Sequence, residues 1–368
     1  MPTRREALAL SATAAATQFF NTSLSGEDAA AQVVDRASSL RITRMTARWV
    51  NPCVFLQIET NHGVVGWGEV KGVDPRVSRP LVELMFELIE GENPTRIEHL
   101  WQKVFRAHRD MRGGPLMIHT LAGIDMALWD IAGKLWGVPV YRLLGGPCRD
   151  RIRVYHTPQA RKVPSPTGAV MFDAHSAVPP ATLIQAAAAI KPYDVLFIEE
   201  PAVPGNIEVF KRLKEQINIP LAAGERDRTI FEVLPYLQHR CLDILQPDCC
   251  HTGGITSMKK IATLAEAWFV PLAPHCTASN LGISASIHVA ASIPNFLIHE
   301  FYPDNPGFNP PGIMRQNWSI DDEGYAALPE GPGLGVEVDE PRLAEEAAKP
   351  QRYRWPGKTL KDGSISDY

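Results

Sequence analysis

Six acidic or imidazole side chains recur along this chain at nearly even intervals, and each stands at the carboxyl end of a short apolar run. Successive members are 26, 26, 23, 27 and 25 residues apart, and the six are Asp173, Glu199, Glu225, Asp248, His275 and Glu300. About 25 residues accommodate one strand, one loop and one covering helix, because parallel strands need a crossover of a dozen or more residues. The spacing therefore predicts consecutive units of a β/α barrel, with these side chains at the mouth formed by the C-terminal ends of the strands.

The predicted barrel begins with a strand at 151–156, and a helix follows each later strand. Apolar residues recur at helical spacing in five segments, 180–191, 205–216, 229–239, 254–267 and 281–291. Between Tyr155 and the run that ends at Asp173 lies TPQARKVPSPTG, a proline-containing stretch too short for a strand and two helices. The spacing thus predicts a modified β/α barrel of seven strands that lacks one β/α unit.

At 368 residues the chain is long for one domain, and its N-terminal part has a different pattern from the barrel. Residues 40–70 contain three strand-like runs, and residues 80–136 contain amphipathic and apolar helical stretches. We therefore expect an α/β protein with an α+β domain at 39–147, the barrel at 148–325 and a separate C-terminal segment at 326–368.

Residues 1–38 lie outside this pattern. Thr3-Arg4-Arg5 precedes a mildly apolar, small-residue stretch that resembles a twin-arginine export signal, which implies a periplasmic protein; a plain tail on a cytoplasmic protein is the alternative. The stretch is too short and too polar for a membrane span. A net charge of −4 without basic runs gives no reason to expect a nucleic-acid partner. The six cysteines form no C-x-x-C pair, and we interpret them as mostly buried thiols.

Asp173, Glu199 and Glu225 end three consecutive predicted strands, so their carboxylates are expected to converge. Carboxylates that lie close together repel one another unless a cation joins them. All-oxygen ligation suits a hard divalent ion, and we predict that these three residues bind Mg²⁺. The alternative is that each carboxylate pairs with a helix amide or an arginine.

The next two predicted strands end at Asp248 and His275. A carboxylate beside an imidazole fixes its tautomer and raises its pKa, so we predict that this pair is a general base. Glu300, on the last strand, is expected to hydrogen-bond a developing oxyanion or to orient the substrate. His175 follows Asp173 by two residues and would face the same cavity if the strand continues, which makes it a second acid/base candidate.

Three neighbouring residues have weaker signals. His251, in CCHTGG, has no carboxylate partner in the strand pattern and is expected to be a loop histidine. Glu200 and Arg226 directly follow two of the predicted metal ligands, and we expect them to line the pocket or to support those ligands.

These groups together predict a reaction at a carbon next to a carboxylate. The substrate carboxylate binds the metal, a base removes the proton on the adjacent carbon, and the metal stabilises the resulting enediolate. An acid on the opposite side then protonates a departing hydroxyl group, so that elimination can occur as well as proton exchange.

The motifs around these residues resemble those of the mandelate racemase branch of the enolase superfamily. The resemblance extends in order over about residues 40–368, through GWGEV (66–70), MALWDIAGKLWG, FDAH, FIEEP, AAGE, LQPD with GGIT after it, APHC, NFLIHE and PGLGV. The D-x-H pattern at 173–175 and DGSISDY at 362–368 are most similar to sugar-acid dehydratases of the galactonate type.

The resemblance implies Mg²⁺ binding by the three carboxylates, proton abstraction by His275 with Asp248, and proton donation to the departing hydroxyl by His175. It also implies that the domain at 39–147, completed by 326–368, caps the barrel, and that the enzyme is a homo-oligomer. The substrate would be a sugar acid (an aldonate), and the reaction that of a carbon–oxygen lyase (hydro-lyase) with a 2-keto-3-deoxy acid as product.

One departure from the family leaves two alternatives. The family's second barrel strand, which carries a lysine-containing acid/base motif in racemase-like members, has no counterpart in this sequence. Within the superfamily, the alternative is a racemase, epimerase or cycloisomerase. The other alternative is an inactive barrel that at most binds metal or ligand, because a barrel that loses a strand gains two unpaired edges.

Overall fold

The computed structural model describes residues 38–107, 109–155, 170–303 and 358–366, and all but a few positions of 305–351. All elements below lie within the unit Leu40–Tyr368. The export signal expected at 1–38 falls almost wholly outside the described residues. The segment 156–169, where a β/α unit is predicted to be missing, also lies outside them.

The N-terminal part is a three-stranded antiparallel sheet with helices packed on it. The sheet has the order β1 (Ile42–Val50), β2 (Cys53–Thr60), β3 (Val65–Val70), and the helices are α3 (Pro75–Ile89), α4 (Ile97–Ala107), the 3₁₀ turn η1 (Arg109–Met111), α5 (Pro115–Trp136) and α6 (Val140–Leu143). These elements confirm the predicted meander followed by helices. The apolar face of the sheet and the apolar stripes of the helices form one core, in which Leu56, Met85 and Ile118 are fully buried.

Helix α5 lies directly on β3 because the GWGEV motif places two glycines on the strand face beneath it. A Cβ atom at Gly68 would lie 1.9 Å from the carbonyl oxygen of Gly123, and one at Gly66 would lie 2.1 Å from that of Ala127. Neither position has room for a side chain, so the strand and the helix backbone approach more closely than other residues would allow. This contact fixes the end of β3, from which Glu69 and Lys71 extend.

The second part alternates strands and helices, as the spacing predicts. Its elements are β4 (Arg151–Tyr155), β5 (Val170–Asp173), α7 (Pro180–Ile190), the 3₁₀ turn η2 (Lys191–Tyr193), β6 (Val195–Glu199), α8 (Ile207–Gln216), β7 (Leu221–Ala223), α9 (Thr229–His239), β8 (Ile244–Leu245), α10 (Gly254–Ala267), α11 (Asn280–Ser292) and β9 (His299–Glu300). All five predicted helices are present, and their ends lie within a few residues of the predicted ones.

Parallel pairing arranges these strands in the order expected of a barrel. Strands β5, β6, β7 and β8 are neighbours in sequence order, and β9 pairs in parallel with β4. Single parallel bridges from Leu245 to Leu272 and from Leu272 to Phe296 connect the two groups. The strand expected before His275 is thus shorter than predicted. These strands share a separate apolar cluster that includes Phe197 on β6, Ala222 on β7 and Ile298 directly before β9.

The described ends of the predicted gap are strands β4 and β5. Within the described residues, β5 pairs with β6, and β4 pairs with β9 and, antiparallel, with β10 (Tyr325–Ala327). The missing β/α unit itself stays a prediction, because the residues between β4 and β5 are not described.

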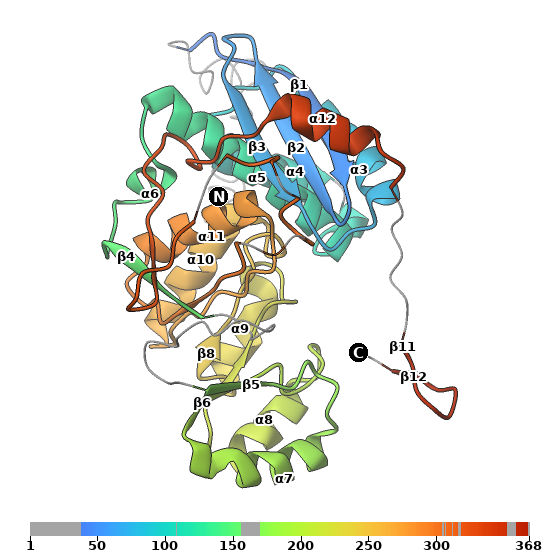
Figure 1. Cartoon of the computed structure of the whole chain (residues 1–368), viewed down its shortest axis with the longest axis vertical. Helices are drawn as coiled ribbons and strands as arrows, with labels where there is room; N and C mark the ends of the chain where they lie inside the picture. Colours follow the sequence, from blue (N-terminus) through green and yellow to red (C-terminus); the bar gives the residue numbers. More distant parts are fainter. Residues whose placement is uncertain are drawn as a thin grey trace, which may run out of the picture. The chain divides into compact units, whose positions relative to one another are not determined.

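The C-terminal segment returns to the N-terminal sheet. Helix α12 (Glu340–Ala348) packs on β1, and Figure 1 shows it lying across the strands of the sheet. Gln57 Nε2 in β2 donates a hydrogen bond to Glu340 Oε2 at 3.0 Å. Beyond it, β11 (Lys358–Thr359) and β12 (Ile365–Ser366) form a short hairpin. Among the described residues, none of the helices combines the length and the apolar character needed to cross a bilayer.

Candidate active site

The structure places the predicted site residues at or just beyond the carboxyl ends of the parallel strands. Asp173, Glu199 and Glu300 are the last residues of β5, β6 and β9. Asp173 and Glu199 are register partners, and Glu199 in turn pairs with Ala222 on β7. Glu225 follows the end of β7 by two residues, and Asp248 follows the end of β8 by three. His275 follows the bridge residue Leu272 by three residues. The rim expected from the spacing is therefore present.

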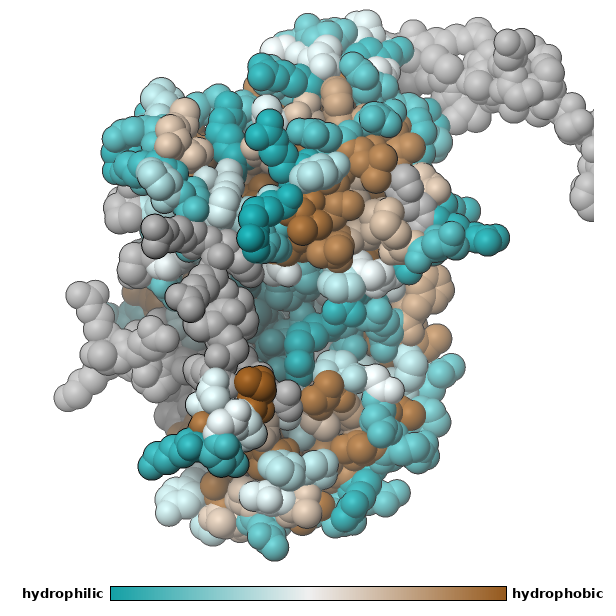
Figure 2. Space-filling view, turned by 90° about the vertical axis from the view of Figure 1, so that its right-hand side faces the viewer, coloured by the Kyte–Doolittle hydropathy of each residue, from teal (hydrophilic) through white to brown (hydrophobic). Residues whose placement is uncertain are grey.

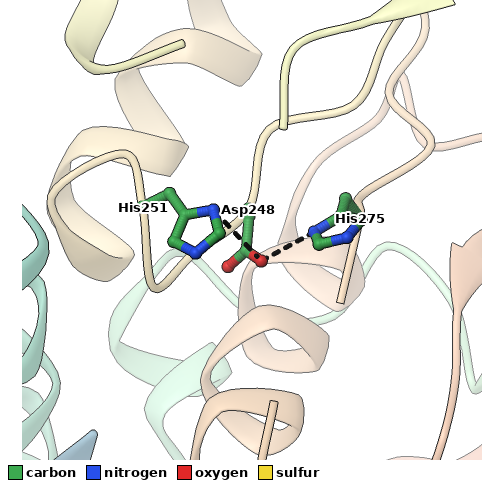
Figure 3. Close-up of side chains that lie close together, drawn as sticks. All are labelled: Asp248, His251 and His275. Carbon is green, nitrogen blue, oxygen red and sulfur yellow. Dashed lines mark hydrogen bonds and ion pairs between the residues drawn. The ribbon is translucent and has the colours of Figure 1, made fainter. Parts of the chain in front are cut away.

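The predicted pairing of Asp248 with His275 is confirmed (Figure 3). Their Oδ2 and Nδ1 atoms lie 2.7 Å apart, and both residues are buried. On the other side of the imidazole, Nε2 of His275 lies 3.6 Å from a carboxylate oxygen of Glu225 and 3.6 Å from one of Glu300. Burial alone would lower the pKa of His275, but the charges of Glu225 and Glu300 and the bond to Asp248 raise it to about 10.

The three predicted metal ligands act on one another electrostatically. Burial raises the pKa of Glu199 well above its usual value, and the charges of Glu300, Asp173 and Glu225 raise it further. Burial also raises the pKa of Asp173, partly offset by the backbone N–H of His175. The three carboxylates share one rim but do not form a group whose ligand atoms all lie within 4.8 Å of one another. A cation bound between them would offset their mutual repulsion.

Within the described residues, a group that does meet this 4.8 Å limit is Asp248, His251 and His275 (Figure 3). Its hydrogen bonds already occupy the Nδ1 atoms of both histidines. His251 Nδ1 lies 2.9 Å from the carbonyl oxygen of Glu225, which can only accept a hydrogen bond, so this nitrogen carries the proton. His251 Nδ1 therefore donates to the carbonyl of Glu225, and His275 Nδ1 donates to the ionised Asp248, so neither Nδ1 atom offers a lone pair to a metal in this arrangement.

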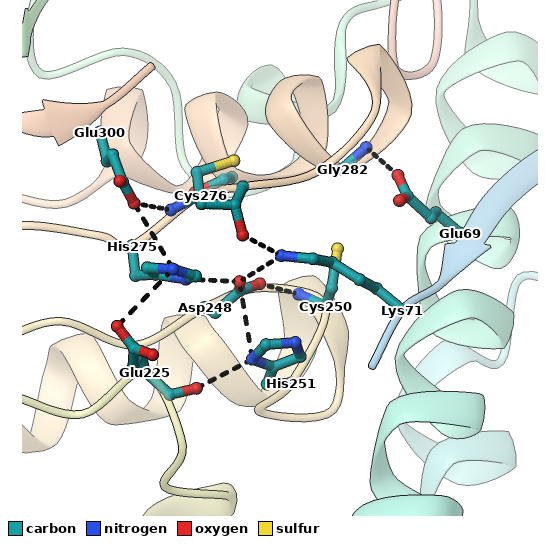
Figure 4. A network of polar contacts seen from close by, with 12 residues as sticks. Glu69, Lys71, Glu225, Asp248, Cys250, His251, His275, Cys276, Gly282 and Glu300 are labelled. Carbon is teal, nitrogen blue, oxygen red and sulfur yellow. Dashed lines mark hydrogen bonds and ion pairs between the residues drawn. The ribbon is translucent and has the colours of Figure 1, made fainter. Parts of the chain in front are cut away.

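Asp248 is instead the centre of a network of donors (Figure 4). The backbone N–H of Cys250 donates to Oδ1 at 2.7 Å, and Lys71 Nζ lies 3.7 Å from Oδ2. Burial would raise the pKa of Asp248, but His251, Lys71 and His275 together lower it well below its usual value. The carboxylate therefore stays ionised and holds the imidazole of His275 in one orientation.

Two members of this network were not expected from the sequence. The expectation that His251 has no carboxylate partner is wrong, because its Nδ1 lies 3.6 Å from Asp248 Oδ2. Its ring also stacks on that of His119 from α5, with the centroids 4.5 Å apart. Lys71 carried no signal beyond its place two residues after Glu69, where a charged residue follows a buried strand. The contact between the two parts of the chain brings Lys71 to Asp248, whereas His251 follows Asp248 by three residues in the same loop.

His175 lies beside Asp173, but not because the strand continues, and that expectation is wrong. Strand β5 ends at Asp173, and the chain turns at His175, whose φ is +47°. The turn places the backbone N–H of His175 2.8 Å from Asp173 Oδ1, and its Nε2 3.1 Å from Oδ2. The side chain is 40% exposed, so it can meet a ligand from solvent.

The remaining predicted residues also have defined partners. Glu300 Oε2 accepts a hydrogen bond from the backbone N–H of Cys276 at 2.8 Å, and burial raises the pKa of Glu300. Arg226 Nε donates to Glu200 Oε1 at 2.7 Å, so these two residues support each other beside the rim, as expected.

Two cavities lie among the helices, and none of the six rim residues is in their walls. One of about 600 Å³ lies between α8 and α9 and is lined in part by Arg226, Asp227 and Arg228. Another, of about 660 Å³, lies between α4 and the helices α9 and α10, with Trp101 and Lys260 in its wall. The face shown in Figure 2 is hollowed near its middle, and hydrophilic side chains line the hollow. Polar walls of this kind suit a hydrophilic ligand.

Comparison with protein families gives matches over most of the chain. The N-terminal domain of mandelate racemase/muconate lactonizing enzyme matches residues 28–145, and the enolase C-terminal domain-like family matches residues 142–342. Enolase-superfamily structures consist of an N-terminal cap and a C-terminal barrel, and the two parts described above correspond to them.

Individual relatives are similar over nearly their whole length. A D-galactonate dehydratase of Ralstonia nicotianae is 35% identical over 384 residues, which cover 89% of this chain and 100% of the relative. The D-galactonate dehydratase of Variovorax paradoxus is 34% identical, over 90% of this chain and 100% of its own. Among solved structures, an enolase from Pantoea ananatis with bound D-gluconate and Mg is 28% identical, with a TM-score of 0.76 over 83% of this chain and 94% of that one.

Proposed function

The chain belongs to the mandelate racemase/muconate lactonizing enzyme family of the enolase superfamily, and from this we infer that it is a hydro-lyase that dehydrates a sugar acid. The observation that carries this function is the His275–Asp248 pair, whose Nε2 faces the rim between Glu225 and Glu300. A cation held by Glu225 would offset a carboxylate charge that raises the pKa of His275 and so favour the neutral imidazole, which is suited to remove a proton from a carbon next to a carboxylate. Because the relatives are named D-galactonate dehydratases, the substrate class is an aldonate, with D-galactonate the first to test.

The donor set at the rim fits Mg²⁺. Asp173, Glu199 and Glu225 offer only carboxylate oxygens, which are the ligands that hard divalent ions prefer. Burial and neighbouring carboxylate charges raise the pKa of Asp173 and Glu199, and a bound cation would offset that repulsion. These three residues would hold the ion, and when bound it supplies electrostatic stabilisation of the negative charge that develops on the substrate carboxylate. The Mg-containing relative from Pantoea ananatis supports this choice of metal.

The protein's own groups divide the proton transfers between two sides of the rim. His275 Nε2 takes the proton from C2 of the aldonate, while Asp248 holds Nδ1–H and keeps the imidazole in place. The C3–O bond then breaks, and His175 gives its proton to the departing hydroxyl, which leaves as water. The resulting enol loses the proton of its C2 hydroxyl group and takes up a proton at C3, which gives a 2-keto-3-deoxy acid. Glu300 is placed to orient the substrate beside His275.

We also propose that the barrel lacks one β/α unit between β4 and β5. The alignment with the Ralstonia nicotianae relative spans 384 positions but uses 89% of 368 residues, or about 328, so about 56 positions of the relative face gaps in this chain. That difference is large enough for a β/α unit, which supports a shortened barrel in which β4 has β10 as its second neighbour and β5, among the described residues, pairs with β6 alone. The second candidate function is therefore an inactive barrel that at most binds metal or ligand.

The test is incubation of purified, Mg²⁺-loaded protein with D-galactonate, D-gluconate and other aldonates, followed by detection of a 2-keto-3-deoxy acid. Formation of the keto acid is the expected result. Exchange of the C2 proton with solvent deuterium without a keto acid would point to a racemase or epimerase. Absence of both from protein that melts cooperatively and binds Mg²⁺ would favour the inactive barrel.

We also propose export by the twin-arginine route, supported by Thr3-Arg4-Arg5 and the apolar stretch after it. The full-length protein should be recovered from the periplasmic fraction of a bacterial host, and replacement of both arginines by lysine should retain it in the cytoplasm. Homo-oligomeric assembly, expected from the family, is tested by size-exclusion chromatography with light scattering.

A further inference from the structure

Two charged residues at the end of β3 reach from the capping part of the chain to the barrel: Glu69 lies beside Gly282, and Lys71 lies next to Asp248 (Figure 4). Glu69 is fully buried and accepts hydrogen bonds from the backbone N–H groups of Ser279, at 3.0 Å, and Gly282, at 3.3 Å. Lys71, two residues later, donates a hydrogen bond to Thr277 Oγ1. Side chains at i and i+2 lie on the same side of an extended chain, so both residues contact the segment that follows His275.

We propose that Lys71 is a positioning residue of the reaction: it is the counter-ion that keeps Asp248 ionised and directed at His275. The kinetic part of this inference rests on the proposed function. Its structural part, the effect of Lys71 on the hydrogen bond between Asp248 and His275, does not.

The need for a counter-ion follows from the burial of Asp248. Its carboxylate is 1% exposed, and an ionised carboxylate in such a place is costly unless it is paired and hydrogen-bonded. Of its ion pairs within the described part of the chain, those with His251 and His275 involve imidazoles that can be neutral, and the one with Lys71 involves an amine. Burial lowers the pKa of His251, and His275 must be neutral to accept a proton, so Lys71 is the cation that remains beside Asp248 when His275 acts as the base.

The position of Lys71 also explains how its charge is retained. Its side chain is 10% exposed, its ammonium group lies 3.7 Å from Asp248 Oδ2, and it lies 5.3 Å from the centre of the Phe308 ring. Thr277, two residues after His275, accepts its hydrogen bond. One ammonium group thus contacts both the carboxylate that orients the imidazole and the segment that carries the imidazole.

A purely structural role of Lys71 can be distinguished by experiment from its proposed role as the counter-ion of Asp248. Glu69 contacts the start of α11 and has no described contact with Asp248, so it suffices as an anchor between the capping part and the barrel. If Lys71 were only a second anchor, its loss would lower the melting temperature and raise KM through a looser cap. As the counter-ion of Asp248, it should change kcat and the His275–Asp248 hydrogen bond.

The experiment compares Lys71→Met and Lys71→Arg with Lys260→Met in the full-length protein. Lys260 is a matched control, because it also forms a lysine–carboxylate ion pair between the two parts of the chain, with Glu98 at 2.6 Å, but has no described contact with Asp248. The first measurement is the low-field Nδ1–H signal of His275 in protein labelled with ¹⁵N-histidine, assigned through His275→Asn. The second is kcat and KM for 2-keto-3-deoxy acid formation from the best aldonate.

We expect Lys71→Met to shift or remove the His275 signal and to lower kcat about 10- to 100-fold, with little change in KM. Lys71→Arg should recover most of both, and Lys260→Met should leave both unchanged. An unchanged signal and kcat in folded Lys71→Met protein would overturn the proposal, as would a rise in KM alone. If Lys71→Met does not fold, Lys71→Gln, which keeps a hydrogen-bond donor without the charge, decides by the same measurements. If the unmodified protein dehydrates no aldonate, the proposed function fails, and the His275 signal still decides the role of Lys71.

Discussion

Nδ1 of His275 lies 2.7 Å from Oδ2 of Asp248, although the two residues are 27 positions apart and follow different strands. The hydrogen bond holds the imidazole of His275 in one orientation. It leaves Nε2 toward Glu225 and Glu300, 3.6 Å from each, where a substrate proton can be received. Each group at this rim therefore has a role that a substitution can test.

Replacement of His275 by asparagine removes the proposed base but leaves the carboxylates of the rim in place. We expect kcat to fall by about 10²- to 10⁴-fold, the usual contribution of a general base, and Mg²⁺ affinity to be retained. Exchange of the C2 proton in deuterium oxide should be lost in parallel, as measured by NMR, with Mg²⁺ binding followed by calorimetry. The exposed His239, at the end of α9, supplies the control His239→Asn, which should behave as the unmodified protein. Retained exchange in His275→Asn would assign proton abstraction to another group.

Glu225→Gln tests the metal site, because it removes one negative charge and changes the shape of the side chain very little. Affinity for hard divalent ions depends on the number of charged oxygen ligands, so we expect Mg²⁺ binding to weaken by about tenfold or more. Isothermal titration calorimetry measures the change directly. Glu208→Gln, on the exposed surface of α8, is the control, and its Kd should not change. Equal Mg²⁺ affinity in Glu225→Gln and Glu208→Gln would exclude Glu225 as a ligand.

The buried carboxyl group of Asp125 predicts a dependence of stability on pH. Burial raises its pKa to about 7 from the usual 3.8, and the residue is 1% exposed. The folded state then binds a proton that the unfolded state releases. Its contribution is fully present below about pH 4 and is lost as the pH rises to about 7, by up to about 1.4 kcal/mol per pH unit.

Asp125→Asn isolates this contribution, because the amide oxygen can still accept the hydrogen bond from the backbone N–H of Thr256, now 3.0 Å from Asp125 Oδ2. Between pH 5 and 7 the melting temperature of the unmodified protein should fall relative to that of Asp125→Asn, and above pH 7 the difference should level off. Parallel curves across pH 5–7 would mean that Asp125 does not titrate in this range.

Gly68→Ala tests the close contact between β3 and α5. The added methyl group would lie 1.9 Å from the carbonyl oxygen of Gly123, which is backbone and cannot move aside without displacing the helix. We expect a loss of about 1–3 kcal/mol or more in the free energy of unfolding, measured by urea denaturation. Gly114→Ala is the matched control, since a Cβ there meets ordinary contacts at 3.4 Å. Equal stability of the two variants would show that the strand and the helix can separate at little cost.

Most of the fold could be predicted from local patterns. Apolar runs of strand length, apolar residues at helical spacing, and a step of about 25 residues predicted the parallel β/α series and the strand ends that bear Asp173, Glu199 and Glu300. The strand before His275 was overestimated, because its apolar residues form only a bridge at Leu272. Apolar character predicts burial, but the length of a ladder depends on the neighbouring strands.

The contacts of individual side chains were less predictable. His175 was expected beside Asp173 on a continuing strand, and the structure brings it there through a turn, because its φ of +47° ends the extended chain. His251 was interpreted as a histidine without a carboxylate partner, yet it lies beside Asp248. Local periodicity contains no information about which loop residues point at one another, because that depends on how the loops are packed.

The sequence by itself determined the order of elements and the identity of the rim, because the pitch of β/α units sets which residues end parallel strands. The tertiary structure alone decided that Lys71 from β3 pairs with Asp248 in the barrel, 177 positions later in the chain. Two segments so distant come together only when the close packing of Gly68 on α5 and the bonds of Glu69 to the start of α11 fix the end of β3 against the barrel. Packing of that kind is a property of surfaces that exist only in the folded protein.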